Sequence, residues 1–148
     1  MRIKLDGTNP KELETYMKNQ EVFSLFAPEL DSNSWNLEIT RNSFWLGFYI
    51  EEKLKGVMLV EQRPNAYLML HPYMLKKDRE YKFKMIKLFE KWAKKNTNSG
   101  KIVGEFPSFY ENLSTFSEKC GYTFMCTNTK SYRLGNVFYD SLMYGKEI

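Results

Sequence analysis

The sequence predicts one mixed α/β domain over residues 1–148, with a mostly antiparallel central sheet flanked by helices in the order β-α-β-β-β-α-β-α-β-β. Three observations support this fold class. The length of 148 residues suits one domain, and 43% of the residues are hydrophobic, which is enough for a core. Short β-prone segments alternate with amphipathic helical patterns. Neither a repeat nor a linker divides the chain.

The N-terminal part predicts a strand followed by a helix. Residues 1–5 form the strand, and Asn9-Pro10-Lys11-Glu12 is a capping box. In a capping box, the first and fourth side chains satisfy backbone N–H groups that the helix start leaves unpaired. The helix continues with a break and ends near Ala27, because Pro28 disfavours helical backbone in the residue before it.

A β-rich section follows. Residues 35–40 alternate between apolar and polar types, residues 44–50 are aromatic and β-prone, and residues 57–60 are apolar. The polar, glycine-containing segment 51–56 predicts an antiparallel hairpin between the last two of these.

Another strand is predicted at residues 66–75, after a turn at residues 63–65. Pro72 interrupts this strand, because proline has no N–H group for the sheet ladder. We therefore expect the strand to be splayed, bulged or at an edge near Pro72.

The remaining chain predicts two helices and three strands. Residues 78–96 form a helix whose apolar stripe is Met85, Ile86, Phe89, Trp92 and Ala93, and whose opposite face carries Lys84, Lys87, Lys91 and Lys94. The other elements are a strand at 102–106, a helix at 108–120, and strands at 123–134 and 137–146 around a Gly135-Asn136 turn.

Composition excludes several classes of protein. The net charge of +4 is milder than the charge typical of nucleic-acid binders. No run of ~18 apolar residues predicts a membrane span, and no signal peptide is evident. With two cysteines, Cys120 and Cys126, we expect reduced thiols and a cytoplasmic location. No metal-ligand spacing, serine–histidine–acid set or nucleotide P-loop is present, so no metal site is predicted.

Three segments resemble the GNAT superfamily of N-acetyltransferases. The segment Gly56-Val57-Met58-Leu59-Val60 is similar to the family's central strand. The predicted strand and helix at residues 103–120 end in Lys119-Cys120-Gly121-Tyr122, which resembles the family's K-x-G-aromatic ending. Residues 133–145 are similar to phage-encoded and ribosomal-protein-modifying branches. The resemblance implies an acetyl-CoA site between the fourth and fifth strands and an amine acceptor.

The resemblance also implies where the cofactor binds. In the family, the junction after the fourth strand, here including Met74 and Leu75, cradles the pyrophosphate of coenzyme A with the motif R/Q-x-x-G-x-G/A. The chain keeps the arginine as Arg79 but has Lys82 and Lys84 at the glycine positions. These lysines either hold a phosphate as point charges or lie in solvent on the helix surface.

Catalytic candidates follow from the same alignment. The family's tyrosine acid is replaced by Ser117, and its pantetheine-binding asparagine by Tyr110, which becomes the candidate acid. His71, the only histidine, is a candidate general base, because an imidazole ordinarily titrates near pH ~6.5. Glu105, near the end of the predicted fifth strand, is a second candidate base. The alternative is that His71 and Tyr110 have structural roles and take no part in catalysis. Asp140 is expected to fix a turn or strand.

Two functions are therefore predicted. One is a GNAT-type N-acetyltransferase that uses acetyl-CoA. The other is an inactive GNAT-fold binding or structural protein with a protein assembly partner, for example a phage virion or head-assembly component. In that case Tyr81, Phe83 or Tyr110 fills the cofactor cleft. Nucleic-acid contact through the lysine-rich face of 78–96 is a weaker hypothesis, because that face is better explained as solubilising charge.

Overall fold

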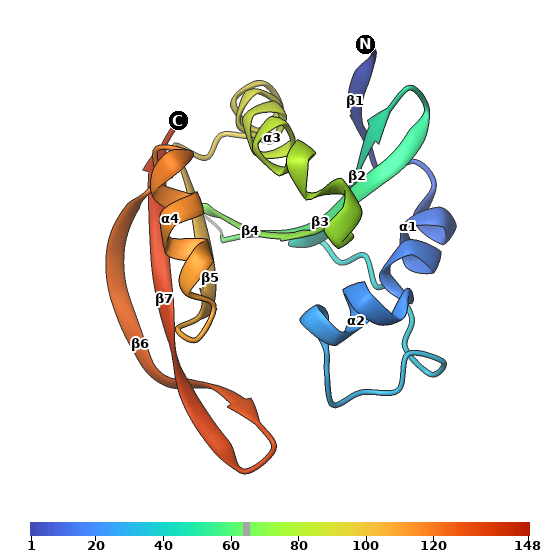
Figure 1. Ribbon diagram of the computed structural model, residues 1–148. Coiled ribbons are helices and arrows are strands. Elements are labelled where there is room, and N and C mark those ends of the chain that lie inside the picture. Colours follow the sequence, from blue (N-terminus) through green and yellow to red (C-terminus); the bar gives the residue numbers. More distant parts are fainter. Residues whose placement is uncertain (64–65) are drawn as a thin grey trace.

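A computed structural model describes residues 1–63 and 66–148 of the protein. The predicted order β-α-β-β-β-α-β-α-β-β is confirmed (Figure 1), with three differences. The first helix is divided into two, a short 3-10 helix precedes the third helix, and residues 35–40 form no strand. The elements are β1 (Ile3–Asp6), α1 (Pro10–Met17), α2 (Gln20–Phe26), β2 (Ser43–Ile50), β3 (Lys53–Gln62), β4 (Leu68–Tyr73), η1 (Lys76–Tyr81), α3 (Lys82–Asn96), β5 (Lys101–Pro107), α4 (Glu111–Lys119), β6 (Thr123–Leu134) and β7 (Val137–Glu147).

The strands form one sheet of seven in the order β1-β2-β3-β4-β5-β7-β6. Within the described residues, neighbouring strands are antiparallel apart from β4 and β5, which are parallel. β4 and β5 pair only at Leu68–Ile102 and Met69–Val103. Beyond this point they diverge, and Pro72 lies on the part of β4 that pairs with β3 but not with β5. The expectation that the strand is splayed near Pro72 is confirmed.

Helices cover both faces of the sheet (Figure 1), and the strands β2, β3 and β4 supply residues to two cores, one on each face. On one face the predicted apolar stripe of α3 packs on β2, β3 and β4, with Phe116 of α4 beside it. On the other face α1 and the start of α2 pack against Trp45 and Val57. α3 and α4 therefore lie on the same face of the sheet, near the place where β4 and β5 separate.

The predicted capping of α1 is observed. The backbone N–H of Glu12 donates to Asn9 Oδ1 over 3.2 Å, and α2 ends at Phe26, next to the predicted boundary at Ala27. The β2–β3 turn is tighter than predicted, because Glu51 and Glu52 both adopt positive φ angles, of 48° and 63°. Two such residues form the two-residue turn that suits the twist of a hairpin, so β3 already begins at Lys53.

The strand predicted at residues 35–40 is wrong, because this segment has no regular secondary structure. Its backbone groups pair with side chains instead: Leu37 N–H donates to the Glu14 carboxylate over 2.7 Å, and the Glu38 carbonyl accepts from the Trp45 indole over 3.1 Å. Trp35 packs against Phe26, with ring centroids 5.2 Å apart. The alternation of apolar residues therefore reflects anchoring to the α1–α2 core rather than a sheet ladder.

Two helix starts differ from the prediction. The helix predicted from Asp78 begins at Lys82, since residues 76–81 form the 3-10 turn η1. The helix predicted from Ser108 begins at Glu111, with Tyr110 at its N-cap. The predicted turn at residues 63–65 includes residues 64 and 65, which lie outside the described part of the chain.

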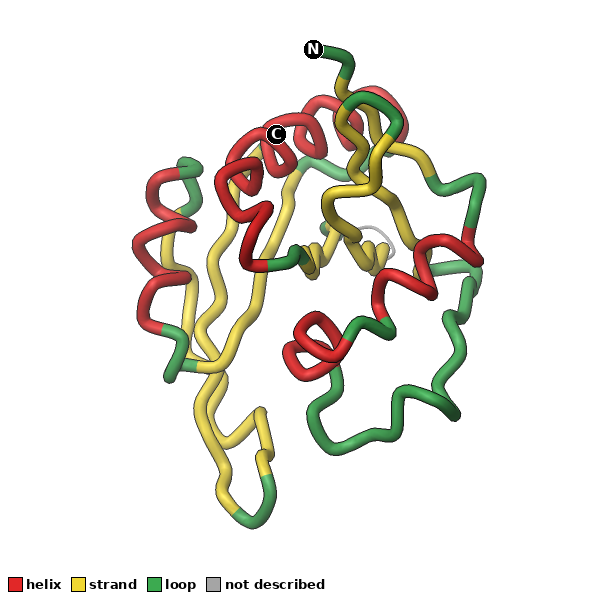
Figure 2. The backbone as a smooth tube through the Cα atoms, turned by 45° about the vertical axis from the view of Figure 1, so that its right-hand side comes forward, coloured by secondary structure: helices red, strands yellow, loops and turns green. Residues whose placement is uncertain are grey.

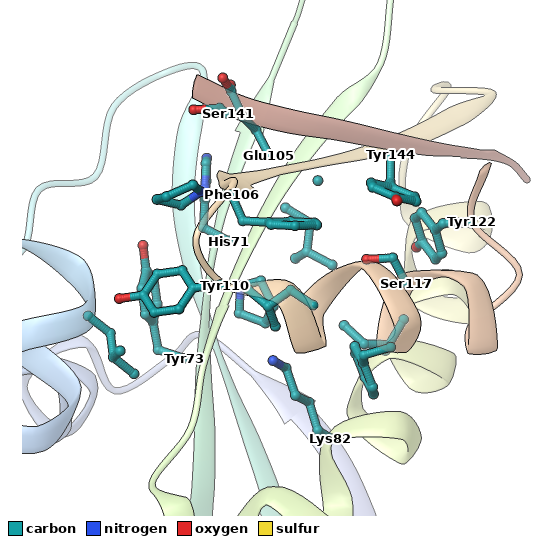
Figure 3. Close-up of a pocket in the computed structure, with 18 of the residues that line it drawn as sticks. His71, Tyr73, Lys82, Glu105, Phe106, Tyr110, Ser117, Tyr122, Ser141 and Tyr144 are labelled. Carbon is teal, nitrogen blue, oxygen red and sulfur yellow. The ribbon is translucent and has the colours of Figure 1, made fainter. Parts of the chain in front are cut away.

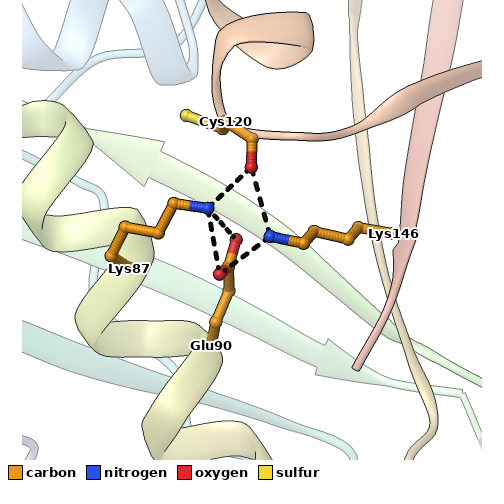
Figure 4. A network of polar contacts seen from close by, with 4 residues as sticks. All are labelled: Lys87, Glu90, Cys120 and Lys146. Atoms are coloured by element: carbon orange, nitrogen blue, oxygen red, sulfur yellow. Dashed lines mark hydrogen bonds and ion pairs between the residues drawn. The ribbon is translucent and has the colours of Figure 1, made fainter.

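One of the four lysines expected on the outer face of α3 faces inward. Lys87 Nζ donates to the Cys120 carbonyl over 2.7 Å and contacts the Glu90 carboxylate, which also binds Lys146 over 3.1 Å (Figure 4). This network joins α3 to the end of α4 and to β7.

Both cysteines are free, with Cys120 buried and Cys126 exposed. In the part of the chain that the structure describes, no helix has the length and apolar character needed to cross a membrane.

Candidate functional site

β4 and β5 diverge in the middle of the sheet (Figure 2). A cleft of about 960 Å³ opens where they separate (Figure 3). Its walls come from the ends of these two strands, the start of α3, one side of α4, and the β6–β7 hairpin. The cleft exists because the sheet ladder between β4 and β5 stops after two residue pairs while each strand stays paired to its other neighbour. Side chains near the ends of both strands therefore face a common space.

The structure brings six of the eight predicted site residues to this cleft. They are His71, Met74, Arg79, Lys82, Glu105 and Tyr110. The other two lie elsewhere. Leu75 N–H donates to Tyr16 Oη over 3.0 Å, outside the cleft, and Lys84 is exposed with its Nζ 5.9 Å from the centre of the Tyr81 ring. The two lysines at the family's glycine positions thus have different surroundings.

Lys82 provides a cationic group inside the cleft. It is the first residue of α3, and its Nζ lies 4.9 Å from the centre of the Phe116 ring. Burial, together with a smaller effect of the nearby Arg79 guanidinium, lowers the pKa of Lys82 to about 8. Among the described residues, no carboxylate forms an ion pair with Lys82. An anionic ligand group would satisfy this ammonium.

His71 and Glu61 form a hydrogen-bonded pair on the β3–β4 side of the cleft. His71 Nε2 lies 3.0 Å from Glu61 Oε2, and Arg63 approaches the same oxygen to 3.7 Å. His71 is opposite Leu59 in the β3–β4 register, so Glu61 lies two residues further along the neighbouring strand. A carboxylate bound to one ring nitrogen holds the imidazole in a fixed orientation, as a general base requires.

Glu105 and Tyr110 face the cleft from the side of β5 and α4 (Figure 3). Glu105 accepts a hydrogen bond from Asn128 Nδ2 over 3.3 Å. The Tyr110 ring packs against Phe109, with centroids 4.6 Å apart. Tyr73 lines the same cleft (Figure 3), and its pKa is raised by burial and by the nearby Glu61. The diverging strands therefore place His71 and Glu105 in one cavity.

Several cleft residues were missed by the sequence prediction. Glu61, Tyr73 and Tyr132 line the cleft, but only the pairing of distant strands brings them there. Tyr122 is also in the lining; its hydroxyl is buried without a hydrogen-bond partner among the described residues, and burial raises its pKa. Asp140 has the structural role that was predicted, because its Oδ1 accepts from the Lys130 backbone N–H over 2.9 Å.

The side chains expected to fill the cleft in an inactive protein leave it open. Tyr81 and Phe83 are not among the lining residues, and Phe83 is exposed. Tyr110 lines the cavity without closing it. The cleft therefore retains room for a ligand.

Comparisons with known proteins identify the fold. No family model matches the chain, and no curated protein matches its sequence significantly. Among solved structures, a GNAT-family acetyltransferase from Streptococcus pneumoniae has a TM-score of 0.76 at 14% identity, covering 99% of this chain and 100% of that one. A probable GNAT-family acetyltransferase from Chromobacterium violaceum has a TM-score of 0.77 at 11% identity, covering 99% and 88%.

A third structure, a spermidine N-acetyltransferase from Vibrio cholerae, has a TM-score of 0.76 at 8% identity and covers 98% of this chain and 93% of that one. The protein has the GNAT fold. At these identities the likeness shows the fold alone, so its activity must be argued from the cleft.

Proposed function

We propose that the protein is an N-acetyltransferase that transfers an acetyl group from acetyl-CoA to an amine. The observation that supports the proposal is the open cleft between β4 and β5. At the start of α3 it contains Lys82, which has no carboxylate partner among the described residues, and on the β3–β4 side it contains the His71–Glu61 pair. The fold supports the same reading, since GNAT acetyltransferases share it.

The cleft residues fit a phosphate-bearing cofactor. Lys82 and Arg79 would hold the phosphates, because both cations line the cleft and Lys82 has no carboxylate partner in the described residues. Lys82 thereby replaces, with a point charge, the backbone cradle that glycines provide at this helix start in the family. Met74 and Phe116 offer apolar lining for the rest of the molecule. When bound, acetyl-CoA supplies an acetyl group activated as a thioester.

The protein's own residues would handle the protons. His71 accepts a proton from the acceptor ammonium, and Glu61, 3.0 Å away, orients the ring and stabilises its charged form. Tyr110 donates a proton to the leaving thiolate of coenzyme A, because its ring lies in the same cavity. Positioning the two reactants in the cleft contributes much of the rate, so the site does not depend on one acid or base alone.

The deciding experiment is calorimetric titration of the protein with acetyl-CoA. We expect saturable binding, weakened about tenfold in Lys82→Met by loss of one charge-assisted phosphate contact. Lys84→Met is the matched control, since Lys84 lies outside the cleft, and should bind like the wild type. Lack of binding by the wild type at millimolar cofactor would reject the proposal and favour the inactive GNAT-fold structural protein.

The base is tested by the pH dependence of acetyl transfer. In the wild type we expect kcat/KM to fall on the acid side of the profile, because a general base must be unprotonated to accept a proton. His71→Gln should lower kcat/KM about 100-fold and remove this limb of the profile. An unchanged profile in the variant would exclude His71 from proton transfer.

A further inference from the structure

The part of the cleft away from Lys82 is acidic. We call it the acceptor side and define it by Glu61, His71, Tyr73, Glu105, Tyr110 and Tyr132. Glu61 on β3 and Glu105 on β5 stand on the two strands that flank the splayed β4, so carboxylates approach the cavity from both of its walls. The arginine and the lysine found in the described lining, Arg79 and Lys82, belong instead to η1 and to the start of α3.

Glu105 is available to a ligand. Its Oε1 accepts one hydrogen bond, from Asn128, and among the described residues it forms no ion pair. Glu61, in contrast, is already engaged by His71 and Arg63. A cation entering the acceptor side therefore finds its free carboxylate at Glu105 while His71 is held across the cavity by Glu61.

Aromatic rings surround these carboxylates. Tyr73, Tyr110 and Tyr132 line the acceptor side, and Phe109 contacts both Tyr110 and Tyr132, with ring centroids 4.6 and 5.8 Å apart. Within the described chain, none of the three hydroxyls has a hydrogen-bond partner in the protein, although they are not sealed from solvent. Ring faces and free hydroxyl oxygens both attract an alkylammonium ion.

A contact between distant segments brings another carboxylate near the acceptor side. The Gly135 N–H at the tip of the β6–β7 hairpin donates to the Glu29 carboxylate, in the segment after α2. Burial raises the pKa of Tyr132, with further contributions from Tyr110 and from Glu29 itself, which places this glutamate near the tyrosines. Glu29 therefore adds a negative charge near the tyrosines of the acceptor side.

From this arrangement we infer that the acceptor is a linear aliphatic diamine or polyamine. The inference rests on the proposed function and specifies its substrate. One amine lies at His71 for acetylation, and a second ammonium binds Glu105 and the tyrosine rings. An acceptor with a neutral or anionic tail leaves Glu105 without its cation or places a like charge beside it.

Three amines of nearly equal length test the inference: diaminobutane, butylamine and γ-aminobutyrate, whose second ends are cationic, neutral and anionic. Release of the coenzyme A thiol gives kcat/KM for each. We expect diaminobutane to exceed butylamine by about tenfold or more, the effect of one ion pair in a partly buried site, with γ-aminobutyrate slowest. Equal values for diaminobutane and butylamine, or preference for γ-aminobutyrate, would overturn the inference.

Glu105→Gln locates the second ammonium. This variant should reduce the ratio of kcat/KM for diaminobutane to kcat/KM for butylamine to about threefold or less. Glu118→Gln on the exposed side of α4 is the matched control and should keep the wild-type ratio. A wild-type ratio in Glu105→Gln would remove Glu105 from acceptor recognition.

A binding measurement separates this inference from the proposed function. In the presence of coenzyme A, diaminobutane should raise the Tm of the wild type more than butylamine does, and this difference should disappear in Glu105→Gln. If acetyl-CoA fails to bind, the proposed function is rejected. If acetyl-CoA binds but diaminobutane gives neither turnover nor a shift in Tm, the acceptor assignment alone is wrong.

Discussion

Lys82 shows how one residue couples stability to ligand binding. Its ammonium lies in the cleft beside Phe116, and burial lowers its pKa from the usual 10.5 to about 8. Between those two pH values the unfolded chain binds a proton at Lys82 that the folded chain has lost. The free energy of unfolding therefore rises with pH across this range, and the buried charge is most costly below about pH 8.

We predict that Lys82→Met raises the free energy of unfolding by about 1–2 kcal/mol at pH 7, a value reduced for the partial exposure of the side chain. The gain should shrink as the pH rises towards 10.5. Urea denaturation at several pH values measures this. Lys84→Met, which changes an exposed lysine, should show no gain, and a gain independent of pH in Lys82→Met would contradict this account.

Gly7 illustrates a different residue-scale constraint, in which the backbone itself occupies the space of a side chain. A Cβ atom at Gly7 would lie 2.7 Å from the Trp45 carbonyl oxygen, whereas a Cβ at Gly100 would meet nothing within 4 Å. Gly7→Ala should therefore lower the free energy of unfolding by about 1–3 kcal/mol, the usual cost of overpacking. Gly100→Ala should be nearly neutral. Chemical denaturation of both variants tests the contrast.

At the scale of secondary-structure elements, irregularities in two strands shape the cleft. The β4–β5 ladder stops at Met69–Val103, which opens the cavity. In the β6–β7 hairpin the register shifts between Asn128 and Tyr132, and Lys130 adopts a positive φ of 50°. This bulge places Tyr132 in the cleft lining.

Asp140 stabilises the bulge by accepting the Lys130 backbone N–H, so we predict that Asp140→Ala lowers the free energy of unfolding by about 1 kcal/mol. The same variant should raise KM for the amine acceptor more than for acetyl-CoA, because the bulge borders the acceptor side. Asp140→Asn keeps an acceptor oxygen and should retain most of both properties. Equal losses in the two variants would exclude this hydrogen bond as the cause.

Most helices and strands could be predicted from the sequence, because each is indicated by a pattern of residues that are close together in the chain. The capping box at Asn9, the apolar stripe of α3 and the Gly135-Asn136 turn each depend on neighbours within a few residues. The prediction failed at residues 35–40, whose backbone is satisfied by Glu14 and Trp45 from other elements. Alternating polarity does not distinguish a strand from a segment anchored by distant side chains.

At the scale of the whole molecule, a polar network joins three elements. Glu90 on α3 binds Lys87 and Lys146, and both ammonium groups also donate to the Cys120 carbonyl at the end of α4 (Figure 4). The Glu90 side chain is 13% exposed, so its charge is screened less than that of a surface residue. The network holds α4, one wall of the cleft, against α3 and β7.

We predict that Glu90→Gln lowers the free energy of unfolding by about 1–3 kcal/mol, because two partly buried ammonium groups lose their shared anion. Glu118→Gln, an exposed change on α4, should be neutral. Denaturation at low and high salt tests the mechanism: the loss should diminish in high salt, where screening weakens repulsion between the lysines. A loss unaffected by salt would indicate packing rather than charge.

The sequence by itself determined the order of elements, their approximate bounds and a resemblance that placed His71, Glu105, Tyr110 and Lys82 in one predicted site. The tertiary structure decided which of the two substituted lysines enters the cleft and paired His71 with Glu61. It also gathered Tyr73, Tyr110 and Tyr132 from three elements around the acceptor side. Local patterns fix secondary structure, whereas strand register and divergence fix which distant side chains meet, and a single sequence records neither directly.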